Sequence, residues 1–213
     1  DAPQKIHPHE RVKNREIGDL LESAARTKPR VIHEDIETAE VRDGGILGGV
    51  VAAGAQLAQL GAAVRGGADA RADALYGAWL CGTVLGHVGM ALHHKLCHTL
   101  GGSFGLPHAQ THAVILPHAL AYNEAAVPDL LAPLAQMLNA PTAGQGLYAF
   151  AQSLHAPQSL RALGLAEADL DRAADLATQS PYPNPCPLEK PALRALLQAA
   201  WEGHPPKPRG YHG

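Results

Sequence analysis

The chain has 213 residues, of which 46% are hydrophobic and only 4% aromatic, so alanine and leucine dominate the apolar residues and favour helices over strands. This length is enough for one domain of ordinary size with its own core. The formal net charge of −3 excludes an extended basic surface for nucleic acid, and three widely spaced cysteines exclude a disulfide framework and favour a reducing cytoplasm.

The N-terminal segment, residues 1–45, differs from the rest of the chain because it is rich in charge and poor in large apolar groups. A short amphipathic helix is predicted over residues 12–27, and Pro29 would end it. The segment shows no basic stretch followed by a hydrophobic one, so no signal peptide is expected.

Residues 46–64 are uncharged and long enough to cross a bilayer, but they contain mostly alanine and glycine. They are therefore predicted to form a close-packed buried helix, and no membrane partner is expected. A long buried helix is predicted for residues 69–92. It runs on into "HHKLCHTL" and ends at Gly101-Gly102, with "SFGL" as a loop.

The remaining sequence predicts five more helices, the first of them opened by Pro107. Their expected ranges are 108–123, 128–139, 143–154, 166–178 and 190–202. No strand and no internal repeat is recognisable. The predicted class is mainly α, with an all-helical domain over residues 46–205 and a tail at residues 206–213.

Four of the thirteen histidines fall within the stretch "HHKLCHTLGGSFGLPH". His94 and His98 share one helical face, His93 and Cys97 form a neighbouring stripe, and the glycine turn could fold His108 back towards His94. Such an arrangement suits a Zn²⁺ or Fe²⁺ site. It also suits acid–base chemistry with His98 or His93 as proton donor, or histidines that merely satisfy buried carbonyls.

The longer stretch "HHKLCHTLGGSFGLPHAQTHAVILPHALAYN" resembles the iron-containing (group III) alcohol dehydrogenase family, and within it the maleylacetate reductases. The "ADALYGAWLCGTVLGHVGMALHHKLCH" and "DLDRAADLATQSPYPNPCP" stretches also look like maleylacetate reductase. The resemblance covers residues 62–203 approximately and leaves out residues 1–45. The positions that match the family's histidine pattern are His94, His98, Gly101 and Pro107-His108.

The resemblance implies the helical C-terminal domain of a dehydroquinate synthase-like fold, here without a recognisable α/β nucleotide-binding domain. The "GGILGG" stretch has no preceding strand, so it is not predicted to be a phosphate loop. The implied activity is the NADH- or NADPH-dependent reduction of maleylacetate to 3-oxoadipate in the degradation of aromatic compounds. The implied partner is thus a small-molecule substrate, and a cytoplasmic homo-oligomer is expected.

By the same resemblance, His94 and His108 correspond to metal ligands for Fe²⁺ or Zn²⁺, and His98 lies in the catalytic cleft. The expected catalytic set is therefore His94, His98 and His108. The family's other two metal positions are not matched, since Pro29 cannot act as a ligand four residues before His33. Metal binding is thus expected to be weak, with His87 or His93 as possible substitutes.

Two other functions remain open. The chain could be the domain of an iron- or zinc-containing alcohol dehydrogenase, or a non-catalytic helical module that binds a metal or a partner chain. Within the histidine stretch, Lys95 is expected to be a surface charge or a carboxylate contact, and Cys97 a packing residue.

Overall fold

The computed structural model describes residues 90–180 and 182–207, together with a few helical positions between 63 and 78. The chain divides into two compact units, Asp1–Val88 and Gly89–Gly213. The helices predicted over residues 12–27 and 46–64 lie outside the described residues, as do His33, His87 and most of the helix predicted over residues 69–92.

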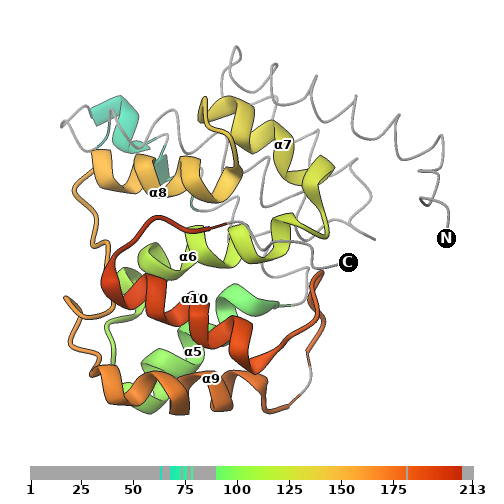
Figure 1. Ribbon diagram of the computed structural model, residues 1–213. Coiled ribbons are helices and arrows are strands. Elements are labelled where there is room, and N and C mark those ends of the chain that lie inside the picture. Colours follow the sequence, from blue (N-terminus) through green and yellow to red (C-terminus); the bar gives the residue numbers. More distant parts are fainter. Residues whose placement is uncertain are drawn as a thin grey trace, which may run out of the picture. The chain divides into compact units, whose positions relative to one another are not determined.

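The second unit is helical, and α6 lies at its centre (Figure 1). Helix α6 packs against α8, and α8 also packs against α7. Helix α6 packs against α5 and α10 as well, and both of these helices pack against α9. The mainly α prediction is confirmed, because residues 90–180 and 182–207 contain no strand. The elements are α5 (Leu92–Phe104), α6 (His108–Glu124), α7 (Pro128–Met137), α8 (Ala143–Ser153), η1 (Glu167–Asp169), α9 (Leu170–Thr178) and α10 (Lys190–Glu202).

The helices predicted from residue 108 onward are confirmed, except that the range 166–178 divides into the 3-10 helix η1 and the α-helix α9. Helix α5 differs at its start. Ala91 has an extended backbone, with φ −117° and ψ −158°, so α5 does not continue from a preceding helix. The backbone N–H of Leu92 instead donates a hydrogen bond to Asn184 Oδ1 at 3.3 Å. This contact satisfies one of the free N–H groups of the first turn.

The predicted end of this helix at Gly101-Gly102 is also wrong. Helix α5 passes through both glycines and ends at Phe104. The chain reverses at Gly105, whose φ of 69° is a left-handed conformation that glycine adopts without strain. The N–H of Gly105 donates to Gly101 O at 3.1 Å and the N–H of Leu106 to Leu100 O at 3.3 Å, which closes the helix end.

A stripe of leucines determines which face of α5 is turned towards the core. Leu92, Leu96 and Leu100 recur every four residues and are fully buried, in a core that also contains Ile115 of α6 and Leu197 of α10. Because this stripe faces the core, the histidines at the intervening positions of α5 face α6 or the solvent. In the described part of the chain, no helix is long and apolar enough to span a membrane.

Helices α6 and α8 approach closely at Gly144, where a methyl group would not fit. An added Cβ would lie 2.7 Å from Pro117 O and 2.8 Å from the Cβ of Ala121. We therefore expect Gly144→Ala to lower the free energy of unfolding by about 1–3 kcal/mol, the usual cost of overpacking, although alanine favours helices. Urea denaturation followed by circular dichroism measures this difference.

Gly102→Ala is the matched control, because it makes the same change within α5. No atom outside the local backbone lies within 4 Å of a Cβ at Gly102. This variant should raise the free energy of unfolding by roughly 0.5–1 kcal/mol, since alanine loses less backbone entropy than glycine. Equal effects at the two positions would show that α6 and α8 are not in close contact at Gly144.

Candidate functional site

Five imidazole rings from α5 and α6 meet in what we call the histidine cluster. Helix α5 contributes His93, His94 and His98, and α6 contributes His108 and His112. The rings form a closed circuit in the order 93, 94, 98, 108 and 112, with neighbouring centroids between 4.3 and 6.1 Å apart. His94 also contacts His112 across the circuit, at 5.2 Å.

The short connection between α5 and α6 brings these rings together. After Gly105, the side chain of Leu106 is buried, and Pro107 adopts φ −65° before α6 begins at His108. Thr111 Oγ1 donates to Pro107 O at 2.8 Å, which fixes the first turn of α6. As a result His108 stacks near His98, with an interplanar angle of 25°.

The cluster has a buried side and an exposed side. His98 and His108 are exposed, whereas the other three rings are partly or largely covered. The Nε2–H of His93 lies 3.3 Å from the carbonyl oxygen of His112, and a carbonyl only accepts, so this nitrogen is the donor. The Nε2 atom of His112 is buried and has no hydrogen-bond partner among the described residues.

Burial keeps the inner rings neutral. It lowers the pKa of His93 to about 3 and that of His112 to about 4, and the neighbouring imidazoles act in the same direction. Burial also lowers the pKa of His94. At neutral pH these three rings therefore carry no charge, but each still has one N–H donor and one free lone pair.

The three predicted catalytic residues lie in this one cluster. His98 contacts both His94 and His108, at 6.1 Å in each case, and His112 contacts the same two rings. Lys95 is turned towards the loop before α10, with its Nζ 5.7 Å from the centre of the Tyr182 ring. Its role as a surface charge or a carboxylate contact stays a prediction.

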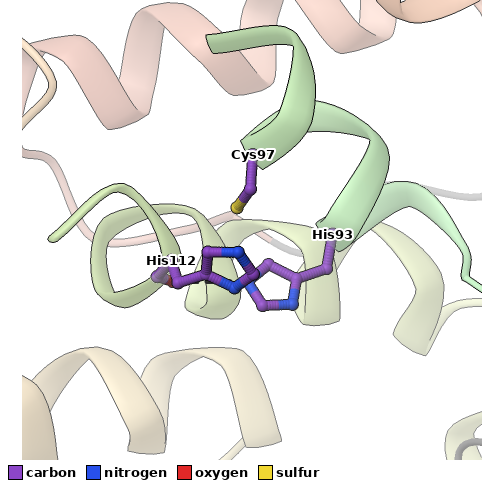
Figure 2. Close-up of side chains that lie close together, drawn as sticks. All are labelled: His93, Cys97 and His112. Carbon is purple, nitrogen blue, oxygen red and sulfur yellow. Dashed lines mark hydrogen bonds between the residues drawn. The ribbon is translucent and has the colours of Figure 1, made fainter. Parts of the chain in front are cut away.

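His112 was not among the predicted site residues, although its spacing from His108 repeats the spacing of His94 and His98. His112 also belongs to the three-ligand group that the described residues contain, His93, Cys97 and His112. Their ligand atoms lie within 4.8 Å of one another, and the Cys97 thiol points towards the two rings (Figure 2). Burial raises the pKa of Cys97 to about 12, so the free thiol is no nucleophile at neutral pH.

The chain matches a known protein family. Residues 49–201 match the profile of the Fe-containing alcohol dehydrogenase family, C-terminal. A maleylacetate reductase from Rhizobium sp. (strain MTP-10005) is 65% identical over 138 residues, which are 65% of this chain and 39% of that protein. The chain thus spans about two fifths of the length of this relative.

Solved structures agree with this match. A maleylacetate reductase from Agrobacterium tumefaciens superimposes with a TM-score of 0.71 at 48% identity, over 89% of this chain and 53% of that one. An iron-containing alcohol dehydrogenase from Corynebacterium glutamicum gives a TM-score of 0.64 at 37% identity, over 71% of this chain and 44% of that one. The chain therefore belongs to the Fe-containing alcohol dehydrogenase family and contains the C-terminal part characteristic of it.

Proposed function

We propose that this chain is the helical, substrate-side part of a maleylacetate reductase. Such an enzyme would reduce the carbon–carbon double bond of maleylacetate with NADH or NADPH and form 3-oxoadipate. The observation that carries the proposal is the histidine cluster, which lies within the region that resembles a relative of this name at 65% identity. The small-molecule substrate, a homo-oligomeric state and a cytoplasmic location belong to the same proposal.

The nicotinamide, when bound, supplies a hydride to one carbon of the double bond. The described helices contain no glycine-rich phosphate loop, so we assign them no part in binding the nucleotide. Their task is at the substrate, where negative charge develops on the conjugated carbonyl oxygen and the adjacent carbon must gain a proton. Hydrogen-bond donors aimed at that oxygen would stabilise the transition state.

The histidine cluster contains groups that could donate hydrogen bonds to the carbonyl oxygen and a group that could deliver the proton to the carbon. His94 and His108 would each donate an N–H to the carbonyl oxygen from opposite sides of the α5–α6 connection. His98 contacts both rings and is exposed, so it can receive a proton from water and pass it towards the substrate carbon. The neutral state of His94 does not prevent this role, because a neutral imidazole retains one N–H.

A metal at His94 and His108 would be held weakly. Two imidazoles are too few for a tight four-coordinate Fe²⁺ or Zn²⁺ site. Among the described residues, the group with three close ligand atoms does not include either of them.

The first test of the proposal is the activity of the chain by itself. We expect the purified 213-residue chain to show no NADH- or NADPH-dependent turnover of maleylacetate, because nothing in its sequence resembles a nucleotide-binding domain. Joined to the nucleotide-binding half of the Rhizobium relative, the same chain should oxidise NADH when maleylacetate is added. Absorbance of the reduced nicotinamide follows both reactions.

Two results would contradict the proposal. Robust turnover by the 213-residue chain alone would show that the nucleotide site lies within it. A folded chimera that oxidises simple alcohols but leaves maleylacetate unchanged would favour the alcohol dehydrogenase function.

A further inference from the structure

We propose that His93, Cys97 and His112 form a binding site for a zinc-class divalent cation, separate from the pair His94 and His108. The site takes two ligands from consecutive turns of α5 and one from α6. It is independent of the reductase activity proposed above, since it depends only on the geometry of these three side chains.

The donor set determines which class of ion would bind. Two imidazole nitrogens and one thiolate suit Zn²⁺ and its spectroscopic substitute Co²⁺ better than Mg²⁺ or Ca²⁺, which prefer oxygen. Binding would release the thiol proton of Cys97 to solvent as the sulfur–metal bond forms. With three protein ligands, the fourth position of the ion remains for a water molecule.

Two hydrogen-bonding features favour a ligand at this place. His93 donates its Nε2–H to the His112 carbonyl, the kind of contact that orients metal-binding histidines, and a neutral ring that donates through one nitrogen keeps a lone pair on the other. His112 Nε2 is buried without a hydrogen-bond partner among the described residues. A buried nitrogen of this kind destabilises the fold unless something occupies its lone pair.

The distances require a small adjustment. Bonds of about 2.0 Å to nitrogen and about 2.3 Å to sulfur hold tetrahedral ligand atoms about 3.5 Å apart. The three ligand atoms already lie within 4.8 Å of one another. Side-chain rotations that bring these atoms closer by at most about 1.3 Å, the difference between 4.8 and about 3.5 Å, would therefore complete the site.

Titration of the full chain with Co²⁺ tests the site directly. We expect one equivalent to bind and to produce a thiolate-to-cobalt charge-transfer band in the near ultraviolet. Cys97→Ser should abolish this band and weaken Co²⁺ binding at least tenfold. Cys186→Ser is the matched control, because Cys186 is the other buried cysteine of the described part, and this variant should keep the band.

His108→Ala distinguishes metal binding at this site from metal binding at the pair His94 and His108. The variant should bind Co²⁺ within about twofold of the wild-type affinity and keep the band, since His108 is not a ligand of the proposed site. Circular dichroism verifies the helicity of each variant. If Cys97→Ser does not fold, His112→Gln serves in its place, with a tenfold loss of affinity expected.

Three results would overturn the proposal. They are the absence of a charge-transfer band in the wild-type chain, its survival in folded Cys97→Ser, and its loss in folded His108→Ala.

Discussion

In a chimera that carries the nucleotide-binding half of a maleylacetate reductase, we expect His94→Ala, His98→Ala and His108→Ala each to lower kcat by about 10²-fold or more. The donors at positions 94 and 108 would act mainly on charge that develops in the transition state, so kcat should fall more than KM rises. Loss of His98 would remove the proton relay, and its effect should depend on pH. Steady-state kinetics of NADH oxidation measures all three effects.

His204→Ala is the control for this series. His204 lies after α10, pairs with Glu202 at 2.9 Å, and has a side chain that is 65% exposed. Its removal should leave kcat and KM within about twofold of the parent, as expected for a surface substitution. If all three cluster variants fold and retain near-parent kcat, the histidine cluster is structural and the proposed roles are wrong.

Most helices were predictable because their ends carry local signals. Pro107 and Pro128 mark the starts of α6 and α7, and the Thr142 side chain accepts the Gln145 N–H at the start of α8. Gly203, at φ 75°, ends α10. The start of α5 has no such signal, since the group that satisfies Leu92 N–H comes from Asn184, distant in the sequence.

The candidate site was predictable in part for a related reason. Spacing of four residues placed His94 and His98 on one face, and this is a property of any helix. Which rings meet across two helices depends on where the chain turns. If the chain reversed at Gly101-Gly102 and not at Gly105, α5 would be shorter by about one helical turn. A helix that ended there would give no reason to expect His112 beside His93 and His94.

The stability of the chain should fall as the pH falls from 7 to 4, and we expect His118 of α6 to be a principal cause. Its side chain is only 3% exposed, and its Nε2 has no hydrogen-bond partner among the described residues. Burial lowers its pKa from 6.5 to about 4. The unfolded chain therefore binds a proton below pH 6.5 that the folded chain takes up only near pH 4.

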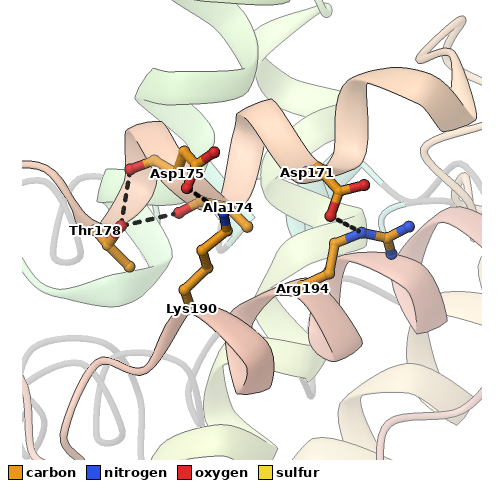
Figure 3. A network of polar contacts seen from close by, with 6 residues as sticks. All are labelled: Asp171, Ala174, Asp175, Thr178, Lys190 and Arg194. Atoms are coloured by element: carbon orange, nitrogen blue, oxygen red, sulfur yellow. Dashed lines mark hydrogen bonds and ion pairs between the residues drawn. The ribbon is translucent and has the colours of Figure 1, made fainter.

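The sign and size of the effect follow from this difference. The stability that the neutral His118 ring contributes is fully present above the pKa of His118 in the unfolded chain. It is lost as the pH falls towards the pKa of His118 in the folded chain, and the loss is about 2 kcal/mol at pH 5 and about 3 kcal/mol at pH 4. His93 and His112 act in the same direction, because burial lowers the pKa of both. The exposed ion pairs between α9 and α10, Asp175 with Lys190 and Asp171 with Arg194, contribute little (Figure 3).

Urea denaturation of wild type and His118→Leu at pH 7, 6, 5 and 4 isolates the contribution of this one ring. Leucine fills the buried site without a titrating group. The free energy of unfolding of the variant should therefore rise, relative to that of the wild type, by up to about 1.4 kcal/mol for each pH unit below pH 6.5. His204→Leu makes the same change at a position that is 65% exposed, and its gain in stability over the wild type on acidification should stay below that of His118→Leu. If the stability of His118→Leu runs parallel to that of the wild type, His118 takes up its proton equally in both states, and the loss of stability in acid must come from the histidine cluster or the carboxylates.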